Sequence, residues 1–109
     1  MQDIIESSQD LEKIISVEKA FVIYITDGTC NVGVNILPKL EKILSENFPQ
    51  LKIYQVYTSL TPEIAAQLSV FVVPTVMVYF EGKLSIQKSR SFSLQELENE
   101  IDRYYQLLF

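Results

Sequence analysis

A continuous apolar run, Phe21 to Ile25, is the feature that most constrains the fold of this chain. A strand without polar alternation is typical of a strand that is buried on both faces of a largely parallel sheet. A helical pattern follows from Cys30 to about Glu46, and a second strand pattern covers Leu51–Tyr57. Strand, helix and strand in this order predict a βαβ unit.

The helix from Cys30 contains Pro38, which removes one backbone hydrogen bond from a helix interior and is therefore expected to bend it. In the second strand, the alternation predicts that Leu51, Ile53 and Tyr57 point inward. Tyr24 is most simply a core aromatic residue.

Local patterns predict the remaining elements, and a first edge strand is either missing or lies within residues 1–6. The other predicted elements are an amphipathic helix at about Ser8–Val17, a short helix from an N-cap at Thr61 through Leu68, a hairpin of Val76–Phe80 and Leu84–Lys88 around Glu81-Gly82, and a C-terminal helix that opens at the capping box Ser93–Glu96.

Composition restricts the class of protein. The 109 residues, 48% of them apolar, suit one domain spanning residues 1–109. A net charge of −5 with scattered basic residues argues against a nucleic-acid partner. The absence of histidine and the single cysteine argue against a metal site, and we expect no cofactor.

The ends and apolar segments carry no membrane or export signal. The N-terminus has an early acid and no apolar signal core, and the longest apolar run, Val70–Phe80, is interrupted by Pro74 and Thr75. We expect no membrane partner, and a lone cysteine fits a reducing cytoplasm.

Cys30 is the candidate nucleophile because it lies where a strand passes into a helix. The unpaired N–H groups of a helix N-terminus favour the thiolate, whereas Asp27 opposes ionisation, so we expect a modestly lowered pKa for Cys30. The alternative is an inert buried thiol.

Two motifs resemble the thioredoxin family. Cys30 is followed eight residues later by Pro38, and Val73-Pro74-Thr75 precedes an apolar strand and the Glu81-Gly82-Lys83 turn. In that family these positions hold the active-site turn with its long helix, and the cis-proline segment with its hairpin. The resemblance implies an α/β thioredoxin fold, with a central mixed sheet of about four strands flanked by helices in the order αβαβαββα.

The chain departs from the family pattern at three positions. The resolving cysteine of Cys-x-x-Cys falls on Gly33, the buried acid falls on Tyr24, and the tryptophan before the first cysteine falls on Thr29. Dithiol reductase activity is therefore not expected. What the resemblance still allows is monothiol exchange at Cys30 for cell redox homeostasis, in which a second thiol arrives from solution.

The resemblance also implies a binding groove for a protein or peptide client, with a small thiol as second partner. The family pairs an extended client with the loop at the cis-proline, as a form of strand addition. Phe71 and Val72 would add an apolar lip. The substrate-binding candidates are Thr29, Asn31, Val32, Gly33, Val73, Pro74 and Thr75.

Other functions remain open. The chain is alternatively a redox-inert peptide-binding or adaptor module that keeps the groove without catalysis, or a sensor in which Cys30 links two chains. The apolar C-terminus, Tyr104–Phe109, is either a fraying tail or a contact patch, and we expect a monomer or weak homodimer.

Overall fold

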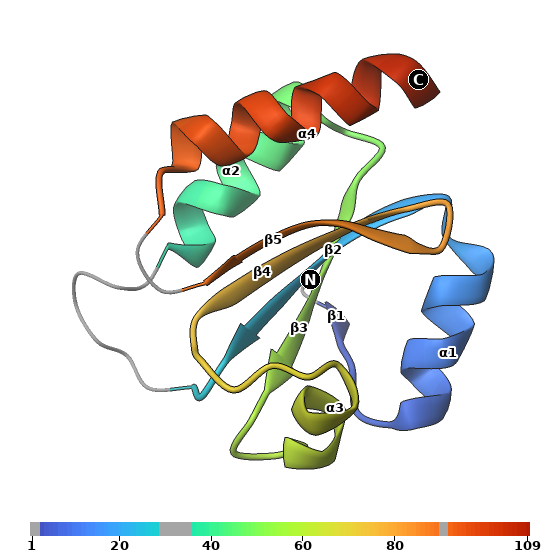
Figure 1. The fold of residues 1–109 in the computed structure, drawn as a ribbon, viewed down its shortest axis with the longest axis vertical. Helices are drawn as coiled ribbons and strands as arrows, with labels where there is room; N and C mark the ends of the chain where they lie inside the picture. The colour runs from blue at the N-terminus through green and yellow to red at the C-terminus, as the bar shows by residue number, and fades with distance from the viewer. Residues whose placement is uncertain (1–2, 29–35, 90–91) are drawn as a thin grey trace.

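A five-stranded sheet with helices on both faces forms the molecule (Figure 1). The computed structural model describes residues 3–28, 36–89 and 92–109. The elements are β1 (Asp3–Ile4), α1 (Ser8–Val17), β2 (Ala20–Thr26), α2 (Leu37–Asn47), β3 (Lys52–Tyr57), α3 (Pro62–Gln67), β4 (Thr75–Phe80), β5 (Lys83–Ser89) and α4 (Leu94–Leu108). Every predicted helix and strand is present.

The strand order is β1-β3-β2-β4-β5. β3 runs parallel to both β1 and β2, while β4 is antiparallel to β2 and to β5. The sheet is therefore mixed, as expected, but it has five strands rather than about four. The additional strand is β1, so of the two alternatives for a first edge strand, absence or a place within residues 1–6, the second is correct.

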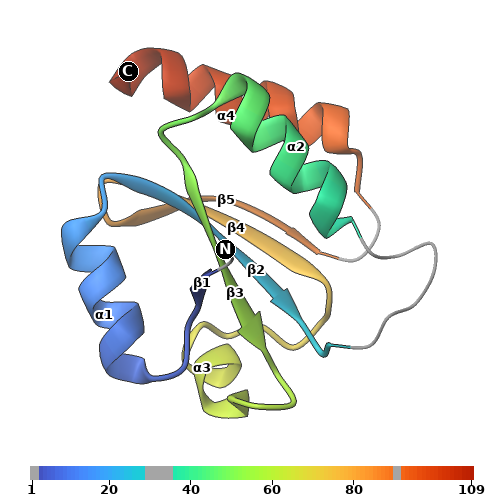
Figure 2. The ribbon, with the colours of Figure 1, turned by 180° about the vertical axis from the view of Figure 1, so that it is seen from behind.

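The two helix layers enclose two hydrophobic cores, one on each face of the sheet (Figures 1 and 2). Leu40 and Leu44 of α2 and Leu97 and Ile101 of α4 are buried in the core on one face. The opposite face is covered by α1 and α3, and its core includes Phe21. Because β2 lies in the centre, its apolar run is buried on both sides.

The alternation predicted for β3 is incomplete. Leu51 is buried and Ile53 and Tyr57 are half-buried, but Tyr54 and Val56 are buried on the other face. The reason is the position of β3 between β1 and β2, with helices on both faces.

The predicted bend of α2 at Pro38 is wrong, while positions 30–35 of the predicted helix lie outside the described residues. The described helix begins at Leu37, and Ile36 is its N-cap. Pro38 therefore occupies the first turn, where a backbone N–H has no intrahelical partner, so the proline removes no hydrogen bond from the helix interior.

The helix caps agree with the sequence at α4. The Ser93 hydroxyl accepts a hydrogen bond from the Glu96 N–H at 3.1 Å. At α3, Thr61 is the N-cap residue but makes no side-chain cap. Its hydroxyl donates instead to the Tyr57 carbonyl at 3.3 Å.

The C-terminus is helical to Leu108 rather than frayed. Lys19 Nζ donates to the Leu108 carbonyl at 3.3 Å and lies 4.9 Å from the centre of the Phe109 ring. Phe109 also packs against Tyr105. Leu107 remains 84% exposed, so the predicted contact patch stays a prediction.

Candidate functional site

The end of β2 and the Pro74 loop lie at the same edge of the sheet. Ile25 is paired with Thr75 in the antiparallel register of β2 and β4. The chain that leaves β2 toward Cys30 and the loop that enters β4 are therefore neighbours. The sequence separates these two motifs by more than forty residues.

A cis peptide bond and hydrogen bonds of the Thr75 hydroxyl hold the loop that enters β4 in its conformation. The Val73–Pro74 peptide bond is cis. Thr75 is fully buried, and its hydroxyl donates to the Val72 carbonyl at 2.5 Å and lies 2.9 Å from the Ser89 hydroxyl. The Thr75 side chain therefore shapes the loop, whereas Val73 and Pro74 are half-buried at the surface.

The other predicted site residues, Thr29, Cys30, Asn31, Val32 and Gly33, lie outside the described residues. Their roles stay predictions. The helix N-terminus expected at Cys30 also lies outside the described residues, and α2 is described from Leu37 onward.

Gly28 directs the chain out of β2, a role that the sequence analysis missed. Its φ of +86° is a conformation that favours glycine, and its N–H donates to the Thr26 hydroxyl at 3.3 Å. A β-carbon there would lie 3.3 Å from Cδ1 of the Tyr57 ring. In the sequence, a glycine two residues after the end of the strand was the available sign of a turn.

A polar cluster lies beneath this edge, on the face that α2 covers. It consists of Tyr24, Gln55 and Tyr57. Gln55 is fully buried, and Tyr57 donates its hydroxyl hydrogen to Gln55 Oε1 at 2.5 Å. In the described part of the chain, Gln55 Nε2 has no hydrogen-bond partner.

Tyr24, which is 3% exposed, keeps this cluster neutral. Burial is the main cause that raises the pKa of the Tyr24 phenol, Tyr57 and Asp27 add to the rise, and a hydrogen bond from the Ile36 backbone opposes it. The Tyr24 phenol is therefore un-ionised at physiological pH.

The raised pKa of Tyr24 predicts an alkaline instability. Because the folded state holds the neutral phenol, this contribution is fully present below the unfolded pKa of about 10 and is lost as pH rises through the folded value. We expect stability to fall less steeply above pH 10 in Tyr24→Phe than in the wild type. Urea unfolding between pH 9 and 11 measures this, and parallel curves would contradict it.

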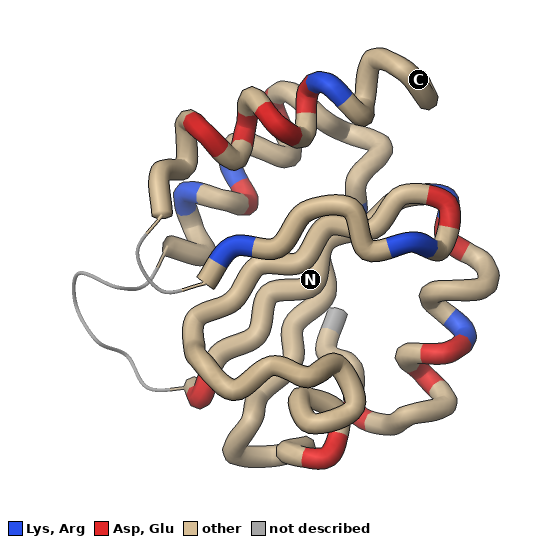
Figure 3. Tube along the Cα trace, viewed as in Figure 1, with Lys and Arg blue, Asp and Glu red and all other residues tan. Residues whose placement is uncertain are grey.

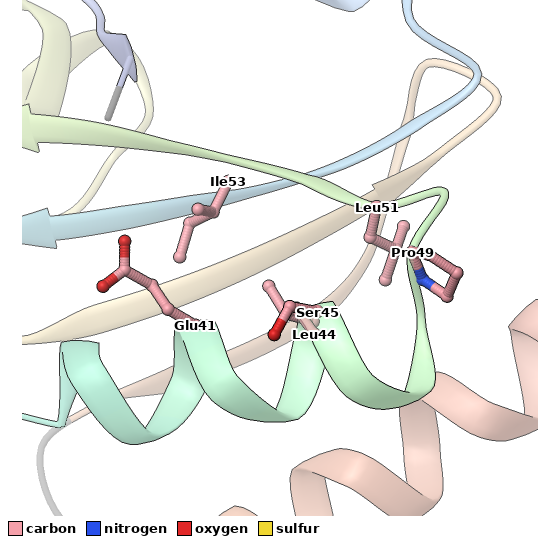
Figure 4. Close-up of a pocket in the computed structure, with 6 residues that line it drawn as sticks. All are labelled: Glu41, Leu44, Ser45, Pro49, Leu51 and Ile53. Atoms are coloured by element: carbon pink, nitrogen blue, oxygen red, sulfur yellow. The ribbon is translucent and has the colours of Figure 1, made fainter. Parts of the chain in front are cut away.

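Two surface hollows lie near the sheet, one at the Pro74 loop and one between α2 and β3. One, of about 300 Å³, lies beside the Pro74 loop and includes Thr58, Phe71 and Val73 in its lining. Figure 4 shows the other, of about 390 Å³, where Glu41, Leu44 and Ser45 of α2 face Ile53 of β3. Only the first contains a predicted site residue.

Within residues 3–28, 36–89 and 92–109, no three His, Cys, Asp or Glu side chains gather as a metal site would require. No helix in these ranges has the length and apolar character needed to cross a bilayer.

Sequence comparison finds a match to the thioredoxin family model over residues 3–103. The chain is also 29% identical over 103 residues to the thioredoxin-like protein YdfQ of Bacillus subtilis (strain 168), covering 94% of this chain and 91% of that protein.

Structure comparison finds the same architecture. Thioredoxin from Fasciola hepatica is 27% identical with a TM-score of 0.79, over 94% of this chain and 98% of the other. Thioredoxin from Trypanosoma brucei brucei reaches a TM-score of 0.83 at 22% identity, over 97% and 92% of the two chains. The second likeness concerns the fold alone.

Proposed function

Because this chain belongs to the thioredoxin family, we propose that it performs monothiol disulfide exchange at Cys30, on clients held along the Pro74 loop. The observation that best supports this is the pairing of Ile25 with Thr75. It brings the strand that leads to Cys30 beside the loop that this family uses for clients.

The reaction needs two thiols from solution in addition to Cys30. The Cys30 thiolate attacks one sulfur of a client disulfide, so that a bond forms between Cys30 and the client while the client disulfide breaks and releases one client thiolate. A second thiol from solution attacks the mixed disulfide and releases the Cys30 thiolate. A further thiol converts the resulting client–thiol disulfide to the free client thiol, so two external thiols supply the two electrons.

Because the chain contains a single cysteine, the proposed cycle depends on thiols from solution. Gly33 stands where the family has its resolving thiol, so no second thiol of the chain can expel the client. Tyr24 stands where the family has its buried acid, and it is neutral. The proposed location is the cytoplasm, where small thiols are abundant.

A second candidate is a redox-inert binding module, and the neutral polar cluster favours it. Tyr24, Gln55 and Tyr57 offer no carboxylate to accept a proton beneath the site. A chain that only binds clients needs no such acceptor.

The rate of Cys30 labelling separates the two candidates. We expect Cys30 to react with oxidised glutathione about threefold faster than free cysteine at pH 7, with an apparent alkylation pKa below about 8.5. Mass spectrometry would follow the mixed disulfide, and Cys30→Ser provides the blank. Labelling equal to or slower than that of free cysteine would reject exchange and leave the binding module.

A further inference from the structure

The hollow beside the Pro74 loop is an apolar groove built from small residues. Its floor and walls come from Thr58, from Ala65 and Ala66 of α3, and from Val70. Ala65 and Val70 are buried, whereas Ala66 is exposed. Alanine side chains at these two helix positions leave the space of about 300 Å³ open.

The turn after α3 holds an aromatic side chain at the rim of this groove. Ser69 has a φ of +59°, its N–H donates to the Ala66 carbonyl, and the Val70 N–H donates to the Ala65 carbonyl at 2.9 Å. After this turn Phe71 is 84% exposed, although it lines the groove. A large exposed apolar side chain at a groove is typical of a contact surface.

The segment that forms the groove carries acidic but no basic side chains. The chain contains no lysine or arginine between Lys52 and Lys83, a span that includes all of the groove. Glu63 is exposed on α3, and Asp27 immediately follows β2. Figure 3 shows these acidic positions at the end of β2 and on α3, with no basic position on the loop between α3 and β4.

We propose that this groove selects clients by taking one large apolar side chain of an extended segment whose neighbouring residue is lysine or arginine. The apolar lining fits the first residue, and Glu63 complements the second. Val73 belongs to the groove and immediately precedes Pro74, so the groove continues the proposed client surface. This inference rests on the part of the proposed function that holds clients at the Pro74 loop.

Four cysteine-free octapeptides test the proposal by NMR titration of the whole protein. They share a Ser/Gly background and carry Leu-Lys, Ala-Lys, Leu-Glu or Ala-Glu at the centre. We expect Leu-Lys to bind about tenfold more tightly than Ala-Lys, because the apolar side chain is buried on binding. We expect it to bind about threefold more tightly than Leu-Glu, because an exposed charge pair contributes little. The amide signals of Ala66 and Val73 should shift.

Matched variants assign each preference to its residue. Ala66→Leu fills the groove and should remove the preference for leucine, whereas Ala66→Ser leaves the groove open and should keep it. Glu63→Lys should reverse the preference for lysine. Glu46→Lys makes the same change of charge at an exposed position on α2 and should not.

Equal binding of the four peptides, or no shift at millimolar peptide, would overturn the proposal, as would an unchanged preference in Ala66→Leu. Because the peptides contain no cysteine, the result does not depend on exchange at Cys30. A reactive Cys30 with no peptide preference would reject the groove alone. A peptide preference with an inert Cys30 would reject exchange and retain the groove.

Discussion

Replacing Phe21 with alanine should lower the free energy of unfolding by about 3–5 kcal/mol, the usual range for a buried phenylalanine. Its ring is fully buried, stacks on Tyr79 at 4.8 Å between centroids, and meets the edge of Tyr54 at 6.1 Å. The substitution leaves a cavity in the core between the sheet and the α1 and α3 layer. For a domain with a total stability of about 5–15 kcal/mol, this is a large fraction.

Phe71→Ala is the matched control, because it removes the same atoms from a side chain that is 84% exposed. We expect its stability to stay within about 0.5 kcal/mol of the wild type. Urea unfolding followed by circular dichroism compares the two variants. A loss below about 1 kcal/mol for Phe21→Ala would show that the core closes around the cavity.

The contrast between Phe21 and Phe71 also separates fold from binding. Phe21 contributes to the core on the α1 and α3 face, while Phe71 lines the surface groove. Phe71→Ala should therefore weaken binding of the Leu-Lys peptide in a protein that remains folded.

The fold could be predicted because its signals are local and agree with one another. The apolar run Phe21–Ile25 identified the central strand, and the Ser93 cap fixed the start of α4. The two family motifs then supplied the order of elements. The bend at Pro38 was mispredicted because the helix was expected to run continuously through Ile36, which is the N-cap of the described helix.

The site could be predicted only in part. The Pro74 loop was found from its motif, but its pairing with the end of β2 depends on the register of Ile25 and Thr75, which no local pattern gives. The groove was missed because Ala65 and Ala66 carry no chemical signal in a sequence. Gln55 was missed because a glutamine in a strand is ordinarily taken as solvent-facing.

The neutral cluster bears on why this chain differs from dithiol members of its family. Tyr24 pairs with Gln55 on β3 and with Val76 on β4, so its buried side chain lies beside one polar and one apolar cross-strand partner. This site suits an uncharged phenol. It does not suit a carboxylate, which leads to the second prediction.

Tyr24→Asp should make stability strongly dependent on pH. Burial raises the pKa of a carboxyl group in such a site above its unfolded value of about 3.9. The folded state then favours the protonated acid, so stability is retained below the unfolded pKa and is lost as pH rises through the folded pKa. At pH 7.5 we expect an additional loss of about 1–3 kcal/mol from the buried charge, beyond the effect of the smaller side chain.

Tyr24→Asn isolates that charge, because it has nearly the same size as the aspartate variant and cannot ionise. Both variants leave a cavity, expected to cost about 3–5 kcal/mol at any pH, so both are measured in sucrose, an uncharged osmolyte that favours the compact state at both pH values. Urea unfolding at pH 4.5 and 7.5 should give curves that separate only for Tyr24→Asp. If the two variants respond alike, Gln55 Nε2 is the donor best placed to compensate the carboxylate, since it has no partner among the described residues. A separation would instead mean that the surroundings of position 24 no longer stabilise a buried carboxylate. Regaining dithiol chemistry would then require changes at Gln55 and Tyr57, in addition to Gly33 and Tyr24.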